Sequence, residues 1–280
     1  FMKLQYWGTA AAEGIPALFC HCDTCRAAKE RGGRNVRTRS QAVLDDTLLL
    51  DFPADTYCHS LRYGADLASF THLLITHSHS DHLYSADFTM RRDGFAHIGS
   101  APALEVYGAA GAIDYAKIEG DPRGDDVGGT VHFRKLLPYT HYDIAGYDVV
   151  ALPARHDPKS FPYVYWIGKG ERGLFYCNDT GPLFDEAWEF LEREKLPMTF
   201  VSADCTDGAR AEMGYDSHMC LARNIDLRDR LLKIGCADEK TLFCCTHFSH
   251  NGEHALYDEY SEIAKKEGFL TAYDGMTVEF

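Results

Sequence analysis

Residues 75–83, ITHSHSDHL, carry the most specific pattern in the chain. They follow an apolar run and bring together His77, His79, Asp81 and His82. In an extended or turning segment, the side chains of His77 and His79 point the same way, because side-chain direction repeats with a period of two. Asp81 and His82, past the turn, then face a neighbouring point. Imidazole and carboxylate groups are ligands for zinc, manganese and iron, so the pattern predicts a site for two adjacent cations.

An apolar strand that ends in polar residues recurs along the chain. The pattern is found at residues 147–157, 161–181, 199–208 and 241–252. QAVLDDTLLLDF, residues 41–52, indicates a hairpin with its turn at Asp45 and Asp46, because β-forming residues stand on both sides. These segments predict strands whose ends carry the polar side chains of the protein.

Two amphipathic segments predict helices. Residues 181–197 have Pro182 in the expected first turn, and residues 253–269 have Gly268 at the expected end. A hairpin followed by alternating strands and helices predicts packed sheets flanked by helices. Residues 84–150 are the hardest part to assign, because they include a long loop rich in Gly and Asp.

Length and composition indicate a globular protein. The chain has 280 residues, 45% of them hydrophobic, which is enough for a substantial core. Apolar runs are too short for a membrane span, and we expect one domain over residues 1–280 because no linker or repeat divides the sequence. The first residues lack the pattern of a secretory signal, which favours a cytoplasmic location. There, ten cysteines suggest metal ligands and buried thiols rather than disulfides.

The charge balance bears on the partners of the protein. The chain carries 28 basic and 42 acidic side chains, a formal net charge of −14. This balance argues against a broad nucleic-acid-binding surface. It is compatible with a small anionic substrate, because bound dications dominate the local charge of a site.

The H-x-H-x-D-H pattern after a strand resembles the signature of the metallo-β-lactamase superfamily. The resemblance implies an α+β fold, the four-layer αββα sandwich of that superfamily, and a hydrolytic site with two metal ions. It covers nearly the whole chain, from Trp7 to the last helix, and leaves residues 84–150 unmatched.

The resemblance also implies three further ligands, each after an apolar strand. They are His156 in LPARHDP, Asp179 in YCNDTG and His247 in CCTHFSH. One cation is then held by His77, His79 and His156, the other by Asp81, His82 and His247, and Asp179 lies between the two.

Cysteines near the start of the chain suggest another metal site. FCHCDTC, residues 19–25, contains Cys20, Cys22 and Cys25, whereas a closed tetrahedral zinc site has four ligands. C-x-C-x-x-C in this position resembles a subgroup that includes the PhnP-type cyclic-phosphate phosphodiesterases and a pyrroloquinoline quinone biosynthesis protein. In the phosphodiesterases the fourth zinc ligand is a histidine three residues after the last catalytic one. That offset is filled by His250, so the resemblance implies a structural zinc.

The resulting hypothesis is a phosphodiesterase that acts on small cyclic or diester phosphates through a hydroxide held by two metal ions, either zinc, manganese or iron. The resemblance places Asp81 and Asp179 in the catalytic centre. His218, in GYDSHM, resembles a position near the substrate phosphate in the subgroup, where it would act as general acid or phosphate-oxygen donor. His218 is also expected to open a helix, and the alternative to a functional role is an ordinary polar residue near that helix start.

Other functions share the scaffold. A tRNA-processing nuclease has the same metal motif but would need a basic RNA-binding arm, and β-lactamases are typically exported. A cofactor-biosynthesis or binding protein related to the quinone pathway is a further alternative. Asp81 and His82 complete a second metal site, which favours hydrolysis over binding. The resemblance is also compatible with a homodimer.

Overall fold

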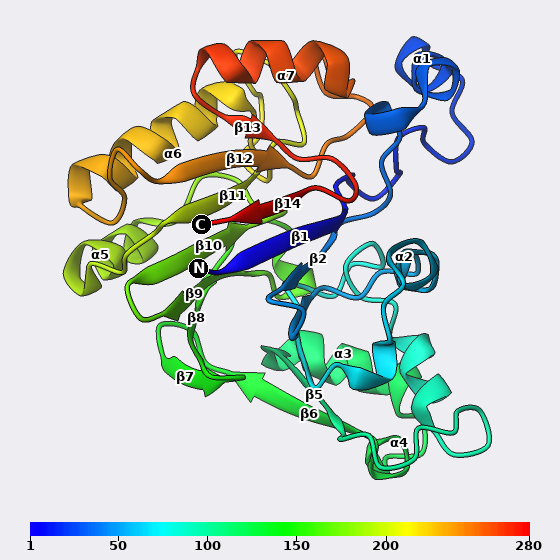
Figure 1. Cartoon of the computed structure of the whole chain (residues 1–280). Helices are drawn as coiled ribbons and strands as arrows, with labels where there is room; N and C mark the ends of the chain where they lie inside the picture. Colours follow the sequence, from blue (N-terminus) through cyan, green and yellow to red (C-terminus); the bar gives the residue numbers. More distant parts are fainter.

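The computed structural model describes all residues from Phe1 to Phe280. Two mixed seven-stranded sheets lie face to face, and helices cover their outer faces (Figure 1). In spatial order, the first sheet contains β14 (Thr277–Glu279), β1 (Lys3–Gly8), β2 (Gln41–Leu44), β3 (Leu48–Leu50), β4 (His72–Leu74), β5 (Leu104–Ala109) and β6 (Val131–Leu136). The second contains β13 (Leu270–Thr271), β12 (Leu242–Thr246), β11 (Phe200–Asp204), β10 (Arg172–Cys177), β9 (Tyr163–Lys169), β8 (Tyr147–Pro153) and β7 (His141–Ile144).

The helices form the two outer layers. They are α1 (Asp23–Arg31), α2 (Thr56–Tyr63), α3 (Ala110–Gly120), α4 (Asp126–Gly129), α5 (Asp185–Glu194), α6 (Leu221–Ile234) and α7 (Tyr257–Lys266). Short 3₁₀ turns occur at η1 (Gly33–Asn35), η2 (Leu67–Ser69), η3 (Ser85–Arg91) and η4 (Pro158–Ser160). None of these helices has the length and apolar character that a bilayer crossing requires.

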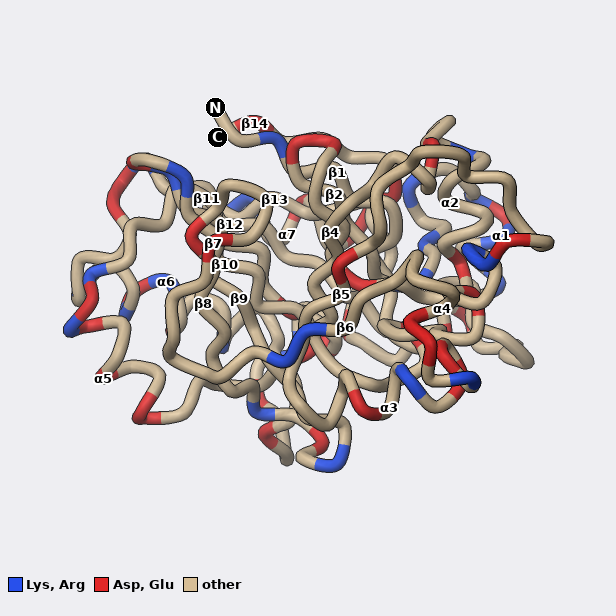
Figure 2. The backbone as a smooth tube through the Cα atoms, turned by 90° about the horizontal axis from the view of Figure 1, so that it is seen from below, with Lys and Arg blue, Asp and Glu red and all other residues tan.

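Three apolar clusters hold the four layers together. The inner faces of the two sheets meet in one cluster, where Leu44 and Leu50 pack with Val149 and Phe200. The second sheet packs against α5, α6 and α7, and the first against α2 and α3. Because both faces of each sheet are covered, the central strands are continuous apolar runs. Accordingly, Figure 2 shows most of the charged residues on helices and loops. The αββα fold is therefore confirmed.

The predicted hairpin is present. β2 and β3 pair antiparallel, and Asp45 and Asp46 in the connecting turn both have positive φ. Aspartate tolerates this backbone conformation better than most residues, which accounts for the two acidic residues at the turn.

Two details of the helix predictions are wrong. α5 begins at Asp185, so Pro182 precedes the helix instead of lying in its first turn. Pro182 is held outside because its carbonyl accepts a hydrogen bond from Arg155 Nε at 2.8 Å. Likewise His218 lies before α6, which begins at Leu221, because Met219 N donates to the side chain of Asp204 instead of continuing a helix.

Residues 84–150 add strands to both sheets. They supply β5 and β6, which extend the first sheet in parallel, together with β7 and the start of β8 in the second sheet. β5 ends at Ala109 and α3 begins at Ala110 with no loop between them, which hides the boundary in the sequence. The Gly/Asp-rich loop closes over Asp121, whose carboxylate accepts hydrogen bonds from the amides of Asp125, Asp126 and Val127.

Candidate functional site

The polar side chains that follow the strands meet at one edge of the sandwich. β10, β11 and β12 run parallel, so their carboxyl ends lie side by side and bring Asp179, Asp204 and His247 together. His156 follows β8, and His77 follows β4 of the opposite sheet. Loops from both sheets therefore surround one point between the layers.

One group comprises His77, His79, His156 and Asp179, whose ligand atoms all lie within 4.8 Å of one another. His79 Nδ1 is 3.0 Å from both His77 Nε2 and His156 Nε2. Asp179 Oδ2 is 3.1 Å from His77 Nε2 and 3.4 Å from His156 Nε2. With metal–ligand distances of about 2.0–2.2 Å, neighbouring ligands of a tetrahedral site are roughly 3.3–3.6 Å apart, close to these values.

Asp81, His82 and His247 form the second group, which shares Asp179 with the first. His82 Nε2 is 3.1 Å from His247 Nε2, 3.2 Å from Asp81 Oδ2 and 3.4 Å from Asp179 Oδ2. All four side chains of this group are buried. The structure thus brings all seven residues of the predicted cluster together, with Asp179 common to both halves.

The outward-facing nitrogens of these histidines have oxygen neighbours, which leaves the inward nitrogens as potential ligands. His82 Nδ1 is 2.7 Å from Asp51 Oδ2, and His247 Nδ1 is 2.9 Å from Thr206 Oγ1. His156 Nδ1 is 3.3 Å from the carbonyl oxygen of Ser217. Such outer hydrogen bonds fix the tautomer of a metal-binding histidine.

The donor set fits cations. With outer nitrogens protonated, the inner nitrogens present lone pairs to one another at about 3 Å, an arrangement that is favourable only with positive charge between them. Asp179 Oδ1 is buried without a hydrogen bond, although it lies 3.0 Å from His218 Nδ1. A buried carboxylate oxygen that is this poorly hydrogen-bonded is a costly feature that a cation would satisfy.

The pKa values of the cluster reflect burial and mutual charge. Burial lowers the pKa of His77 to about 4 and also lowers that of His156. Burial acts in the same direction on His82 and His247, but the neighbouring carboxylates outweigh it and raise both pKa values. Burial alone would raise the pKa of Asp179, yet the surrounding histidines, His247 foremost, hold it well below its usual range. The carboxylates therefore favour positive charge here, whether proton or metal.

Backbone conformation marks some of the same residues. Asp179 and His247 have φ of 54° and 60°, in the left-handed region that non-glycine residues rarely adopt. Asp51, the partner of His82, has φ of 66°. Such conformations cost about 1–3 kcal/mol and concentrate at functional sites, which agrees with the placement of these residues.

His218 lies beside the cluster. Its Nδ1 is 3.0 Å from Asp179 Oδ1 and 3.5 Å from Asp204 Oδ2, while Nε2 has no hydrogen-bond partner in the protein. Burial opposes protonation, but these two carboxylates raise the pKa of His218 to about 11. His218 is thus a proton-carrying group with one nitrogen available to a ligand.

Two buried acidic residues of the site are not predicted from the sequence. Asp51 accepts hydrogen bonds from Thr76 N and Oγ1 and contacts His82, and Asp204 contacts both His218 and His247. Asp51 directly follows the apolar strand β3, and Asp204 ends the apolar strand β11. The pattern of an apolar strand that ends in polar residues could therefore have indicated both.

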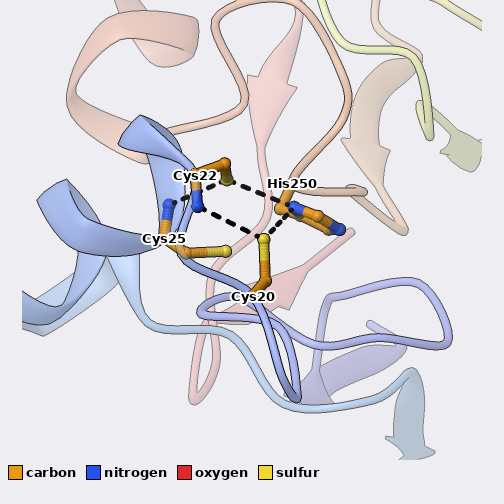
Figure 3. A group of neighbouring side chains, drawn as sticks. All are labelled: Cys20, Cys22, Cys25 and His250. Carbon is orange, nitrogen blue, oxygen red and sulfur yellow. Dashed lines mark hydrogen bonds between the residues drawn. The ribbon is translucent and has the colours of Figure 1, made fainter.

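The cysteine group is closed. Cys20, Cys22, Cys25 and His250 have their ligand atoms within 4.8 Å of one another, and Figure 3 shows the side chains converging. His250 Nδ1 is 3.5 Å from Cys20 Sγ and 3.4 Å from Cys22 Sγ, near the roughly 3.6 Å expected around tetrahedral zinc. Burial acts against ionisation of Cys22, but hydrogen bonds from His250 and the Cys25 amide lower its pKa to about 6. Burial raises the pKa of Cys25 to about 11, so this thiol needs positive charge beside it to ionise. A cation such as zinc would supply that charge, and the four donor atoms fit it.

Backbone amides also point at the sulfurs. Ala17 N donates to Cys25 Sγ at 3.2 Å, Cys22 N to Cys20 Sγ at 3.4 Å, and Cys25 N to Cys22 Sγ at 3.4 Å. Each sulfur therefore receives one N–H, which stabilises thiolate charge. The loop is folded around the four side chains.

An αββα sandwich with H-x-H-x-D-H at this edge defines the class of metal-dependent hydrolases with the metallo-β-lactamase fold. The family described as "Beta-lactamase superfamily domain" matches residues 46–233, more than half of the chain. The chain belongs to this superfamily.

Similar proteins agree with the fold. A diphosphatase from the PhnP family superposes with a TM-score of 0.74 at 19% identity, covering 100% of this chain and 97% of that one. Zn²⁺-bound PqqB from Methylobacterium extorquens gives a TM-score of 0.72 at 16% identity, covering 99% of this chain and 100% of that one. Ribonuclease Z from Listeria welshimeri is 24% identical over 195 residues, 66% of this chain. The match spans only 58% of the length of that ribonuclease.

Proposed function

We propose that this chain is a phosphodiesterase that hydrolyses small cyclic or diester phosphates with two divalent cations. The observation that carries the proposal is Asp179, which is shared by two four-residue groups of suitable ligands and lies next to His218. The likeness to a PhnP-family diphosphatase gives further support.

The two groups would hold the cations. His77, His79 and His156 face one half of the cluster, Asp81, His82 and His247 face the other, and Asp179 belongs to both. Zinc, manganese and iron all accept these ligands. When bound, such cations supply Lewis acidity that makes water nucleophilic near neutral pH and withdraws charge from phosphoryl oxygens.

His218 is the proposed general acid. Asp204 and Asp179 face Nδ1, so that nitrogen keeps its proton and Nε2 is directed to the substrate side. Nε2–H would donate to the oxygen of the leaving alcohol, a role worth roughly 10²–10⁴ in rate. Cations at Asp179 would offset its negative charge and bring the pKa of His218 down from its high value toward neutrality.

The Cys20, Cys22, Cys25 and His250 group is proposed to hold a structural zinc. A four-ligand site with no open position does not bind substrate. His250 lies three residues after His247, so the site would fix the segment that carries a ligand of the catalytic centre.

A nuclease of the tRNA-processing type is the second candidate, because the chain also resembles ribonuclease Z over 195 residues. The two candidates share the metal cluster and differ in substrate size. Cleavage of precursor tRNA, with rates on small phosphodiesters far lower, would favour the nuclease.

The proposal is tested by turnover of bis(4-nitrophenyl) phosphate and a panel of cyclic phosphates with Mn²⁺ and Zn²⁺. We expect turnover in the native protein, loss of turnover in His77→Ala and Asp179→Ala, and metal analysis showing two exchangeable cations and one firmly held zinc. In His218→Ala, kcat should fall by about 10²–10⁴ with metal content retained. Full activity in His77→Ala, with that cation absent, would refute the proposed site.

A further inference from the structure

Glu13 is the one charged residue of the active-site pocket that stands outside the histidine–carboxylate cluster. The pocket has a volume of about 180 Å³ and is lined by Ala11, Ala12, Glu13, His79, Asp81, His156, Asp179, Thr206, His218 and His247. No Lys or Arg is among these residues. The side of the pocket formed by the N-terminal segment therefore presents two small alanines and one carboxylate.

Glu13 is held in place by the segment that follows His247. Ala11 N donates to the carbonyl of Phe248 at 2.9 Å, which joins the N-terminal segment to that strand end. Ser249 Oγ donates to Glu13 Oε1 at 3.2 Å, and His250 Nε2 is 3.8 Å from the same oxygen. Oε2 accepts no hydrogen bond from the protein, and the side chain is 38% exposed. One oxygen is thus fixed and the other is available.

The chemistry of a carboxylate restricts what lies beside it. An ionised carboxylate accepts hydrogen bonds and donates none, so a neighbouring substrate group must be a donor.

We propose that Glu13 determines substrate specificity. Its carboxylate accepts a hydrogen bond from a free hydroxyl on the alcohol part of a singly charged phosphodiester. This inference rests on the proposed phosphodiesterase function.

A matched pair of substrates tests the proposal with the metal-loaded protein. Glycerol 1,2-cyclic phosphate and propane-1,2-diol cyclic phosphate carry the same charge and differ by one hydroxyl. We expect kcat/KM to favour the glycerol compound by about tenfold or more, the value of a hydrogen bond to a charged group.

Glu13→Ala should bring the glycerol preference close to one. Glu13→Gln keeps an acceptor oxygen without the charge, so it should retain part of the hydroxyl preference. Glu30→Gln, an exposed residue of α1 that does not line the pocket, makes the same charge change and should leave the ratio at the native value.

Several results would overturn the inference. The first is a native protein without hydroxyl preference, and the second is a Glu13→Ala variant that keeps the preference. The third is a Glu13→Ala variant that loses zinc and turns over both substrates equally poorly. That result would mean that Glu13 only supports His250 and does not contact the substrate. If the native protein hydrolyses neither compound with either metal, the proposed function fails and this inference with it.

Discussion

At the scale of single residues, the site depends on buried carboxylates that orient histidines. Asp51 is fully buried and receives Thr76 N at 2.7 Å, while its other oxygen faces His82 Nδ1. The carboxylate thus keeps a proton on Nδ1 and leaves Nε2 free for a cation.

Asp51→Asn should weaken metal binding at the Asp81–His82–His247 group by about 10–100-fold. The amide would place N–H beside His82 Nδ1, so the imidazole would protonate Nε2 instead and lose its ligand lone pair. Metal content after dialysis, with circular dichroism to confirm folding, measures the effect. Asp157→Asn is the matched control, because exposed Asp157 lies 3.5 Å from His79 Nε2 and should change affinity little. Equal affinities in both variants would contradict this role.

His59 provides a pH dependence separate from the metal cluster. It is buried, with Nδ1 2.7 Å from Gln41 Oε1 and Nε2 2.7 Å from Thr38 Oγ1. Burial lowers its pKa to about 4, so the unfolded chain binds a proton at a higher pH than the folded one. Stability is therefore lost as pH falls from about 6.5 to 4, by about 3 kcal/mol from this residue.

Urea unfolding of the metal-free protein at pH 7 and pH 4.5 measures this loss. His59→Gln should be less stable at pH 7 but should lose less on acidification than the native protein. His141→Gln, which changes an exposed histidine, should follow the native acid dependence. If His59→Gln loses as much unfolding free energy between pH 7 and pH 4.5 as the native protein, other groups cause the acid dependence.

The proximity of the seven cluster residues could be predicted from the sequence, because each follows an apolar strand in a recognisable order. Asp51 and Asp204 follow strands too, but a single acidic residue after a strand is common. Their role depends on contacts across 31 and 43 positions with His82 and His247, which only the folded chain reveals.

At the scale of elements, the loop between β11 and α6 carries His218 over the end of β10. Gly181, just after β10, lies so close to this loop that a Cβ atom there would be 1.7 Å from the carbonyl oxygen of Asp216. Only glycine permits this approach, so the loop position depends on it.

Gly181→Ala should move the loop and lower kcat by about 10- to 100-fold, because catalysis is sensitive to displacements near 1 Å. Metal content should be retained, since no ligand of the cluster lies on the loop. Gly214→Ala is the control within the same loop, because a Cβ at Gly214 meets nothing within 4 Å. Steady-state kinetics and metal analysis of both variants measure the effect. An unchanged kcat in Gly181→Ala would show that the loop accommodates the Cβ atom without displacing His218.

Element boundaries were less predictable than element types. Strands with long apolar runs, such as β8 to β12, were clear from the sequence. β5 and β6 were not, because β5 leads straight into α3 and β6 contains the charged Arg134 and Lys135. Pro182 was misplaced because proline at a helix start is also compatible with the extended segment before it.

At the scale of the whole molecule, the cluster joins the two halves of the sandwich. His77 to His82 follow the first sheet, and His156, Asp179 and His247 follow the second. A cation bound at the cluster would contact side chains from both layers only when the protein is folded. Its binding would therefore add to the stability of the fold.

Chelation should therefore lower the melting temperature. At a free Mn²⁺ or Zn²⁺ concentration 100 times the dissociation constant, each cation contributes about 2.7 kcal/mol. Differential scanning calorimetry with and without a chelator measures the change. Chelation should lower the melting temperature of His77→Ala by less than it lowers that of the native protein. An equal decrease in both proteins would mean that the stabilising cations bind outside this cluster.

The pairing of the first residues with the last strands has a consequence for biosynthesis. β1 pairs with β14, Ala10 pairs with Phe248, and the cysteine loop meets His250. A nascent chain whose residues 247–280 have not yet emerged from the ribosome therefore has neither a completed first sheet nor the four residues of the cysteine group together. Closure of the sandwich, and of every ligand group that includes His247 or His250, waits for this last segment to emerge.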